Sequence, residues 1–101
     1  MAESTIKKID KVTYEELNLG TYASSVWVAK MLQVVTIFIG NGAASPAGQV
    51  IGTLPEKYRP VMKVEFTDSY GHKRVRIEPS GEITAVEGGT IRGGMSFISA
   101  I

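Results

Sequence analysis

The chain has 101 residues, 44% of them hydrophobic, and its eleven basic and ten acidic side chains give a formal net charge of +1. This length and composition indicate one folded domain, and the near-neutral charge argues against a general attraction to nucleic acid or anionic membranes. There is no cysteine, which excludes disulfides and thiolate metal sites, and no apolar run is long enough to predict membrane insertion.

The N-terminal stretch is the most polar part of the chain. Residues 1–16 read MAESTIKKIDKVTYEE and lack the alternation of apolar and polar side chains that marks a strand. We therefore predict an N-terminal arm or neck over residues 1–16 and a β head domain over residues 17–101. Within the head domain, residues 17–22 are expected to form a short edge strand.

The next two segments have strong strand signals. Residues 24–29 alternate, with Val26 and Val28 on one face and Trp27 on the other. Residues 34–39 read VVTIFI and are β-branched or aromatic throughout. Because both faces of this second strand are mainly apolar, we expect it to be central in a sheet or covered by another subunit.

The rest of the chain alternates short apolar runs with turns rich in glycine and proline. Further strands are expected at residues 49–53, 61–67, 73–78, 83–86 and 95–101. In the second of these, Met62, Val64 and Phe66 are expected to point inward. With seven or eight short strands and almost no helix, the sequence predicts an all-β fold, either a compact antiparallel barrel or a jelly-roll-like sandwich.

Residues 51–61, IGTLPEKYRPV, interrupt this pattern near the middle of the chain. Pro55 and Pro60 each lack a backbone donor, so no central strand can run through them. The segment is predicted to be an ordered, extended crossover between two β layers, and not a helix. Its apolar anchors are expected to be Leu54, Tyr58 and Val61.

The same stretch carries a family resemblance. The phrase GTLPEKYRP resembles a (G)TLP-x-x-Y-R-P phrase found in the C-terminal head domains of bacteriophage tail fibres and baseplate receptor-binding proteins. The strand pair VWVAKMLQVVTIFI, the turn PSGE before ITAV, and the closing MSFISAI are similar to the same family. Together these features cover residues 24–101. The chain departs from the pattern at residues 31–33, Met-Leu-Gln, where such domains would carry glycine and asparagine.

The resemblance implies a non-enzymatic head domain that attaches a phage tail to a saccharide on the bacterial surface. It also implies a homotrimer, other phage tail proteins as partners, and a location in the virion after synthesis in the host cytoplasm. An alternative is a structural module that trimerises or caps a fibre without binding a receptor. A second alternative is a small nucleic-acid-binding β-barrel, in which Lys73, Arg74 and Arg76 would form the basic face.

The candidate receptor site lies on the predicted hairpin loop after residue 67, because loops carry binding residues without disturbing a core. Tyr70 could stack on a sugar ring, Asp68 and Arg74 could hold hydroxyls by charge-assisted hydrogen bonds, and His72 would add a proton-sensitive contact. Trp27, the only tryptophan, is the next candidate, either as an exposed platform or as a core or interface residue.

The sequence offers no cofactor site and little sign of catalysis. His72 is the only histidine, which leaves no histidine pair for a metal and a single candidate base for a nucleophile. The glycine-rich residues 87–94 lack the lysine and the following helix of a phosphate-binding loop. The sequence therefore favours a binding or structural protein over an enzyme.

Overall fold

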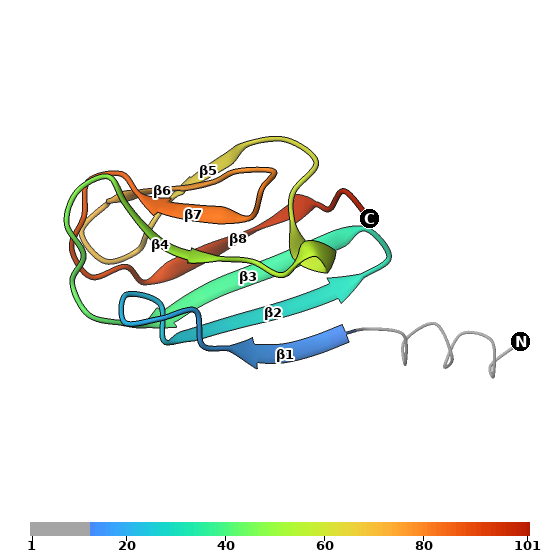
Figure 1. Cartoon of the computed structure of the whole chain (residues 1–101), viewed down its shortest axis with the longest axis horizontal. Coiled ribbons are helices and arrows are strands. Elements are labelled where there is room, and N and C mark those ends of the chain that lie inside the picture. The colour runs from blue at the N-terminus through green and yellow to red at the C-terminus, as the bar shows by residue number, and fades with distance from the viewer. Residues whose placement is uncertain (1–12) are drawn as a thin grey trace, which may run out of the picture.

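The structure, a computed structural model, describes residues 13–101, which form eight β-strands and one short 3-10 turn (Figure 1). The elements are β1 (Thr13–Leu17), β2 (Ser25–Met31), β3 (Val34–Asn41), β4 (Gln49–Thr53), η1 (Glu56–Tyr58), β5 (Val64–Thr67), β6 (Arg74–Ile77), β7 (Glu82–Ala85) and β8 (Gly93–Ile98). The predicted all-β fold of seven or eight short strands is confirmed. Of the expected arm, residues 1–12 lie outside the described residues, and residues 13–16 belong to strand β1 and not to an arm.

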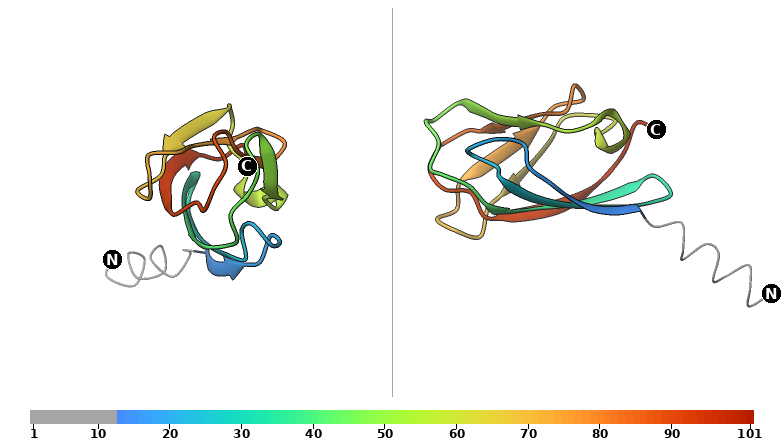
Figure 2. Two further views of the ribbon diagram at one scale, coloured as in Figure 1. Left: turned by 90° about the vertical axis from the view of Figure 1, so that its left-hand side faces the viewer. Right: turned by 60° about the horizontal axis from the view of Figure 1, so that its bottom comes forward.

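The strands form two four-stranded antiparallel sheets. The first sheet has the order β1-β2-β3-β8 and the second has the order β4-β7-β6-β5. They lie face to face as two layers (Figure 2), and within residues 13–101 no strand ladder joins one sheet to the other. Of the two predicted architectures, the molecule is therefore sandwich-like and not a closed barrel.

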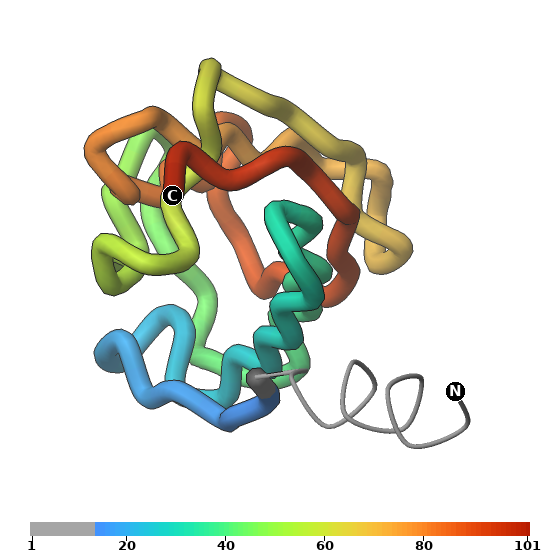
Figure 3. The backbone as a smooth tube through the Cα atoms, turned by 90° about the vertical axis from the view of Figure 1, so that its right-hand side faces the viewer, coloured from blue at the N-terminus to red at the C-terminus, as the bar shows by residue number. Residues whose placement is uncertain are grey.

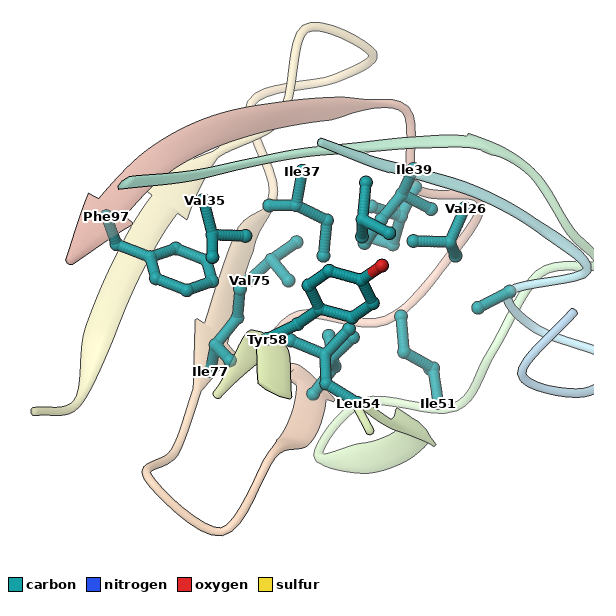
Figure 4. Packing of buried hydrophobic residues seen from close by; sticks show 14 of the residues in the cluster. Val26, Val35, Ile37, Ile39, Ile51, Leu54, Tyr58, Val75, Ile77 and Phe97 are labelled. Carbon is teal, nitrogen blue, oxygen red and sulfur yellow. The ribbon is translucent and has the colours of Figure 1, made fainter. Parts of the chain in front are cut away.

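The core between the sheets follows from the period of two in each strand. On β2, Val26 and Val28 are buried, and on β3 so are Val35, Ile37 and Ile39. Side chains of the second sheet meet them from the opposite side, around the ring of a buried tyrosine (Figure 4). Burying each such aliphatic side chain contributes about 1.5–3 kcal/mol, so this alternation is the main source of stability.

The segment between β4 and β5 differs from the prediction in its path. Both strands belong to the second sheet, at its opposite edges, so the chain crosses one end of the sandwich and does not pass between layers. Leu54 and Tyr58 are fully buried as expected, and η1 gives this stretch one 3-10 turn where we predicted only extended chain. Arg59 Nε donates to the Leu54 carbonyl oxygen at 3.0 Å. This hydrogen bond joins the two ends of residues 54–59, within the TLP-x-x-Y-R-P segment.

Two other expectations for this region are wrong. Val61 was expected to anchor the crossover and Met62 to point into the core, but both are exposed, Met62 at 65%. The reason is that β5 begins only at Val64. Before it, the backbone of Pro60 forms a bridge to Ser99, which holds this part of the chain against the end of β8 and turns the next side chains outward.

The N-terminal edge strand also lies earlier than predicted. It spans Thr13–Leu17 and pairs with β2, whereas residues 18–24, which include most of the predicted edge strand, form a loop. The Asn18 side chain accepts a hydrogen bond from Gly20 N at 3.0 Å, and Gly20 has a φ of +130°. That conformation suits glycine and ends the extended chain.

A buried tyrosine fastens β1 to the crossover. The Tyr58 hydroxyl donates to Glu15 Oε1 at 2.6 Å, and Lys57 Nζ lies 3.5 Å from the same oxygen. The hydrogen bond from Tyr58 lowers the pKa of Glu15 below its ordinary value. Burial, together with this hydrogen bond, raises the pKa of Tyr58, so the phenol is protonated throughout the neutral range.

This contact predicts a pH-dependent stability. Because the folded-state pKa of Glu15 is depressed, its contribution is fully present above the unfolded-state value and is lost as the pH falls through the folded-state value. We expect Tyr58→Phe to lower the midpoint of urea unfolding at neutral pH. The difference in midpoint between this variant and the parent, here called the gap, should narrow near about pH 3. In a Glu15→Gln background the gap should not vary between these conditions. An equal gap at both pH values in the parent background would show that the ionised Glu15 is not the partner.

Candidate functional site

The two ends of the sandwich differ in character. One end, here the basal end, carries the β2–β3 turn, the crossover, the start of β1 and the C-terminus (Figure 1). The opposite end, here the distal end, carries the β3–β4 loop, the β5–β6 hairpin loop and the β7–β8 loop. The hairpin proposed from the sequence as the receptor site therefore lies at the distal end.

Asp68 in that hairpin is buried, with 2% of its surface exposed, which corrects the expectation of an accessible carboxylate. Its Oδ1 accepts from Lys73 N at 2.6 Å and its Oδ2 accepts from Arg92 N at 3.3 Å. Lys73 Nζ lies 3.5 Å from Oδ2. The carboxylate thus joins the β5–β6 hairpin to the β7–β8 loop, and its oxygens are occupied within the protein.

The tip of the same hairpin is open to solvent. Tyr70 and His72 are exposed, and Lys73 Nζ lies 5.4 Å from the centre of the Tyr70 ring. Gly71 and His72 both have positive φ values, +96° and +58°, which make the tight turn that presents these side chains. Tyr70 and His72 can therefore reach a ligand, and their binding role stays a prediction.

Arg74 is accessible but already has a partner. Its Nε donates to Glu87 Oε2 at 2.8 Å, and the Arg74 backbone N donates to Oε1 of the same side chain at 2.5 Å. Hydrogen bonding with Glu87 raises the pKa of Arg74, and the same contacts lower the pKa of Glu87. A ligand hydroxyl at Arg74 would have to compete with this bidentate pair.

Trp27 lies on the outer face of the first sheet and not in the core. It is 37% exposed, and its ring stacks on that of Tyr14 with the centroids 5.4 Å apart and the planes at 24°. Of the readings given for Trp27, the exposed platform and the interface residue fit this position. The hairpin and Trp27 are on separate surfaces, because β5 and β6 belong to the other sheet.

The strand register arranges the outer face of the first sheet in three rows. The row nearest the basal end contains only apolar side chains. The middle row begins with a tyrosine and continues with small or hydroxylated side chains. The row nearest the distal end begins with a glutamate, continues with two aromatic side chains and ends in a glycine. The rows are Met31–Val34–Ile98, Tyr14–Ala29–Thr36–Ser96 and Glu16–Trp27–Phe38–Gly94. Glu16 is the only carboxylate in these rows, which contain no basic side chain. It accepts a hydrogen bond from Ser25 Oγ at 2.6 Å.

A groove opens where the aromatic row ends. A hollow of about 420 Å³ lies beside Phe38 and Gly94, bounded on the other side by Thr67 and Ser69. Its full lining is Thr36, Ile37, Phe38, Thr67, Ser69, Gly93, Gly94, Met95 and Ser96. None of these side chains carries a charge, so the groove presents a ring, hydroxyls and exposed backbone.

The basal end gathers most of the large apolar side chains that are exposed. The β2–β3 turn contributes Leu32, at 86% exposure, and Val61 N donates to the Ile98 carbonyl oxygen at 3.0 Å, which brings the crossover beside β8. Figure 3 looks onto this end, where the β2–β3 turn (teal), the crossover (yellow-green) and the C-terminal segment (red) are all seen. The basal cluster is Met31, Leu32, Val34, Val61, Met62, Ile98 and Ile101.

Comparison with known proteins adds no identification. No family model matches the chain, and a search of curated proteins finds no significant match. Among residues 13–101, no helix has the length and apolar character needed to cross a membrane. The same residues contain no group of three or more histidine, aspartate or glutamate side chains placed to hold a metal ion.

The sequence did not single out the groove or the basal cluster. The partner of Phe38 on β8 is Gly94, and pairing between strands so distant in sequence cannot be read from alternation alone. Residues 34–39 were expected to be central in a sheet or covered by another subunit, and β3 has a neighbouring strand on each side in the first sheet. The exposure of Met62 was not expected, because the strand containing it was predicted to begin too early.

Proposed function

We propose that this chain is a non-enzymatic β head domain of a phage tail fibre or baseplate, which assembles as a homotrimer and attaches the virion to a saccharide on the bacterial surface. The basal cluster is the observation that supports this proposal most. The distal end, with its exposed Tyr70 and His72, is free to face the receptor. The resemblance of residues 52–60 to head domains provides the family context.

The basal cluster has the composition of a subunit interface. Its seven side chains are apolar, they come from three separate parts of the chain, and each is more than 40% exposed. Isolated exposed apolar residues are normal on monomers, whereas exposed apolar side chains gathered at one end of the molecule are typical of an interaction surface. A second and third copy would bury it, and the hydrophobic gain would add to the modest stability of a small domain.

The alternative is a structural module that trimerises or caps a fibre and binds no receptor. The same basal cluster favours it equally, because an interface is all that it requires. The distal surfaces separate the two functions, since a purely structural module has no need of a neutral groove or an exposed aromatic tip. Binding of saccharides by the isolated protein is the property that distinguishes them.

Charge introduced at the basal cluster should dissociate the oligomer. Val34 and Ile98 are directly opposite across β3 and β8, so Val34→Lys with Ile98→Glu places an oppositely charged pair there that the sheet tolerates. We expect this double variant to elute as a folded monomer, because two charges per subunit would lose water in the interface. Light scattering after size-exclusion chromatography measures the mass, and circular dichroism checks the fold.

Val50→Lys is the matched control for that experiment. Val50 is also an exposed valine on a strand, but it lies on β4 in the second sheet and outside the basal cluster. It should keep the oligomeric mass of the parent. If the control dissociates and the basal double variant does not, the interface lies on the second sheet and the proposed assembly is wrong.

A further inference from the structure

We infer that the groove beside Phe38 and Gly94 binds a neutral saccharide unit, with one sugar face against the Phe38 ring. This inference rests on the proposed attachment function and assigns its receptor contact to a groove beside the predicted hairpin, and not to the hairpin tip. Phe38 is 45% exposed, which leaves nearly half of this side chain accessible at the edge of the hollow. An apolar sugar face packs on such a ring through dispersion and area burial.

The polar groups of the groove suit hydroxyl ligands. Thr36 Oγ1 and Ser96 Oγ lie 2.8 Å apart and hydrogen bond to each other. Each hydroxyl has one donor and two acceptor positions, so the pair keeps capacity for a ligand. Across the hollow, Thr67 is exposed on β5, and Ser69 Oγ donates to the Arg92 carbonyl oxygen at 2.8 Å. Hydroxyls thus stand on both sides of the space.

Charge selects among the possible ligands. None of the nine lining side chains is ionised at neutral pH, so nothing in the groove offsets the desolvation of a charged ligand. This favours a neutral hexose or N-acetylhexosamine over an anionic sugar or a phosphate. The hollow of about 420 Å³ falls within the range of small-molecule sites, about 300–1,000 Å³.

The groove is positioned to work while the basal cluster is covered. Phe38 and Gly94 are in the row nearest the distal end, whereas Val34 and Ile98 are in the row nearest the basal end. Thr67 immediately precedes the distal hairpin loop. An oligomer formed through the basal cluster would therefore present several copies of a weak site together, and such copies bind a repetitive surface by avidity.

Nuclear magnetic resonance on the full chain tests this inference. The probes are methyl glucoside, methyl galactoside and N-acetylglucosamine, with N-acetylneuraminate as the anionic comparison and a tetraglycine peptide as the extended-backbone comparison. We expect at least one neutral sugar to bind in the millimolar range and to shift the amide signals of Thr67, Ser69, Gly93 and Gly94. Neither comparison probe should shift these signals.

Two variants locate the site, and a third serves as control. Phe38→Ala should weaken sugar binding about tenfold, the loss expected for one stacked ring, and Thr67→Trp should abolish it by filling the groove. Thr53→Trp is matched to the second variant, because Thr53 is also exposed on an edge strand of the second sheet. It should bind sugar like the parent.

Several outcomes would overturn the inference. One is that sugars shift only the amide signals of Tyr70 and His72, and another is that tetraglycine shifts the groove amides while no sugar does. The others are that no neutral sugar binds, or that both groove variants bind sugar like the parent. The oligomeric mass of the parent is measured separately and does not depend on these results. A trimer whose groove binds no sugar would therefore reject this site while leaving the proposed assembly intact.

Discussion

Asp68→Ala is expected to reduce the free energy of unfolding by about 3 kcal/mol, because it removes a buried carboxylate that accepts two backbone hydrogen bonds. The substitution leaves the backbone N–H groups of Lys73 and Arg92 without their acceptor and leaves Lys73 Nζ without its ion pair. Both the β5–β6 hairpin and the β7–β8 loop should loosen together. Urea unfolding followed by circular dichroism measures the change.

Glu82→Gln is the control for the loss of a carboxylate charge. Glu82 is exposed on β7, so this substitution should alter the free energy of unfolding by less than about 0.5 kcal/mol. If Asp68→Ala were as mild as the control, the buried carboxylate would not be what joins the two distal loops. Amide exchange at Ser69 and Arg92 would independently report whether those loops open.

Gly94→Ala is expected to be at least as damaging, with a loss of several kcal/mol in the free energy of unfolding. A Cβ at this position would collide with the Ile37 carbonyl oxygen and lie 2.8 Å from Phe38 Cα. Both atoms belong to the backbone of the central strand β3 and cannot rotate away. The close approach of β3 and β8 therefore depends on the missing side chain, as does the floor of the groove.

Gly40→Ala provides the contrast within the same strand. A Cβ at Gly40 would meet its nearest neighbour, the Phe38 ring, at 3.5 Å, which is ordinary contact. We expect a change of about 1 kcal/mol or less. Thermal unfolding of the two variants side by side gives the comparison, and equal stabilities would mean that the backbones of β3 and β8 are farther apart than described.

Much of the fold could be predicted because it depends on local alternation. Val26 and Val28 on β2, and Val75 and Ile77 on β6, are buried as the period of two indicates. The hairpin after Thr67 also follows from a local signal, since Gly71 supplies one of the positive φ values that the turn requires. These features depend on neighbours in the sequence.

The features that were missed depend on pairing between distant parts of the chain. Asp68 is in an ordinary turn sequence. Its carboxylate is buried where it accepts a hydrogen bond from Arg92 N, and Arg92 is 24 positions away in the sequence. The start of β5 was misplaced because Val61 and Met62 continue an alternating pattern, while the bridge between Pro60 and Ser99 diverts the backbone. The groove likewise needs Phe38 and Gly94 to be opposite each other, which alternation does not specify.

The mass of the parent protein in solution tests the central claim most directly. Size-exclusion chromatography with light scattering at micromolar concentration should give about three times the chain mass, because the proposed assembly would bury the basal cluster between copies. The mass should fall toward that of one chain on dilution or in the Val34→Lys and Ile98→Glu double variant. A parent that remains a stable monomer at these concentrations, with its basal cluster exposed to water, would contradict the proposed assembly.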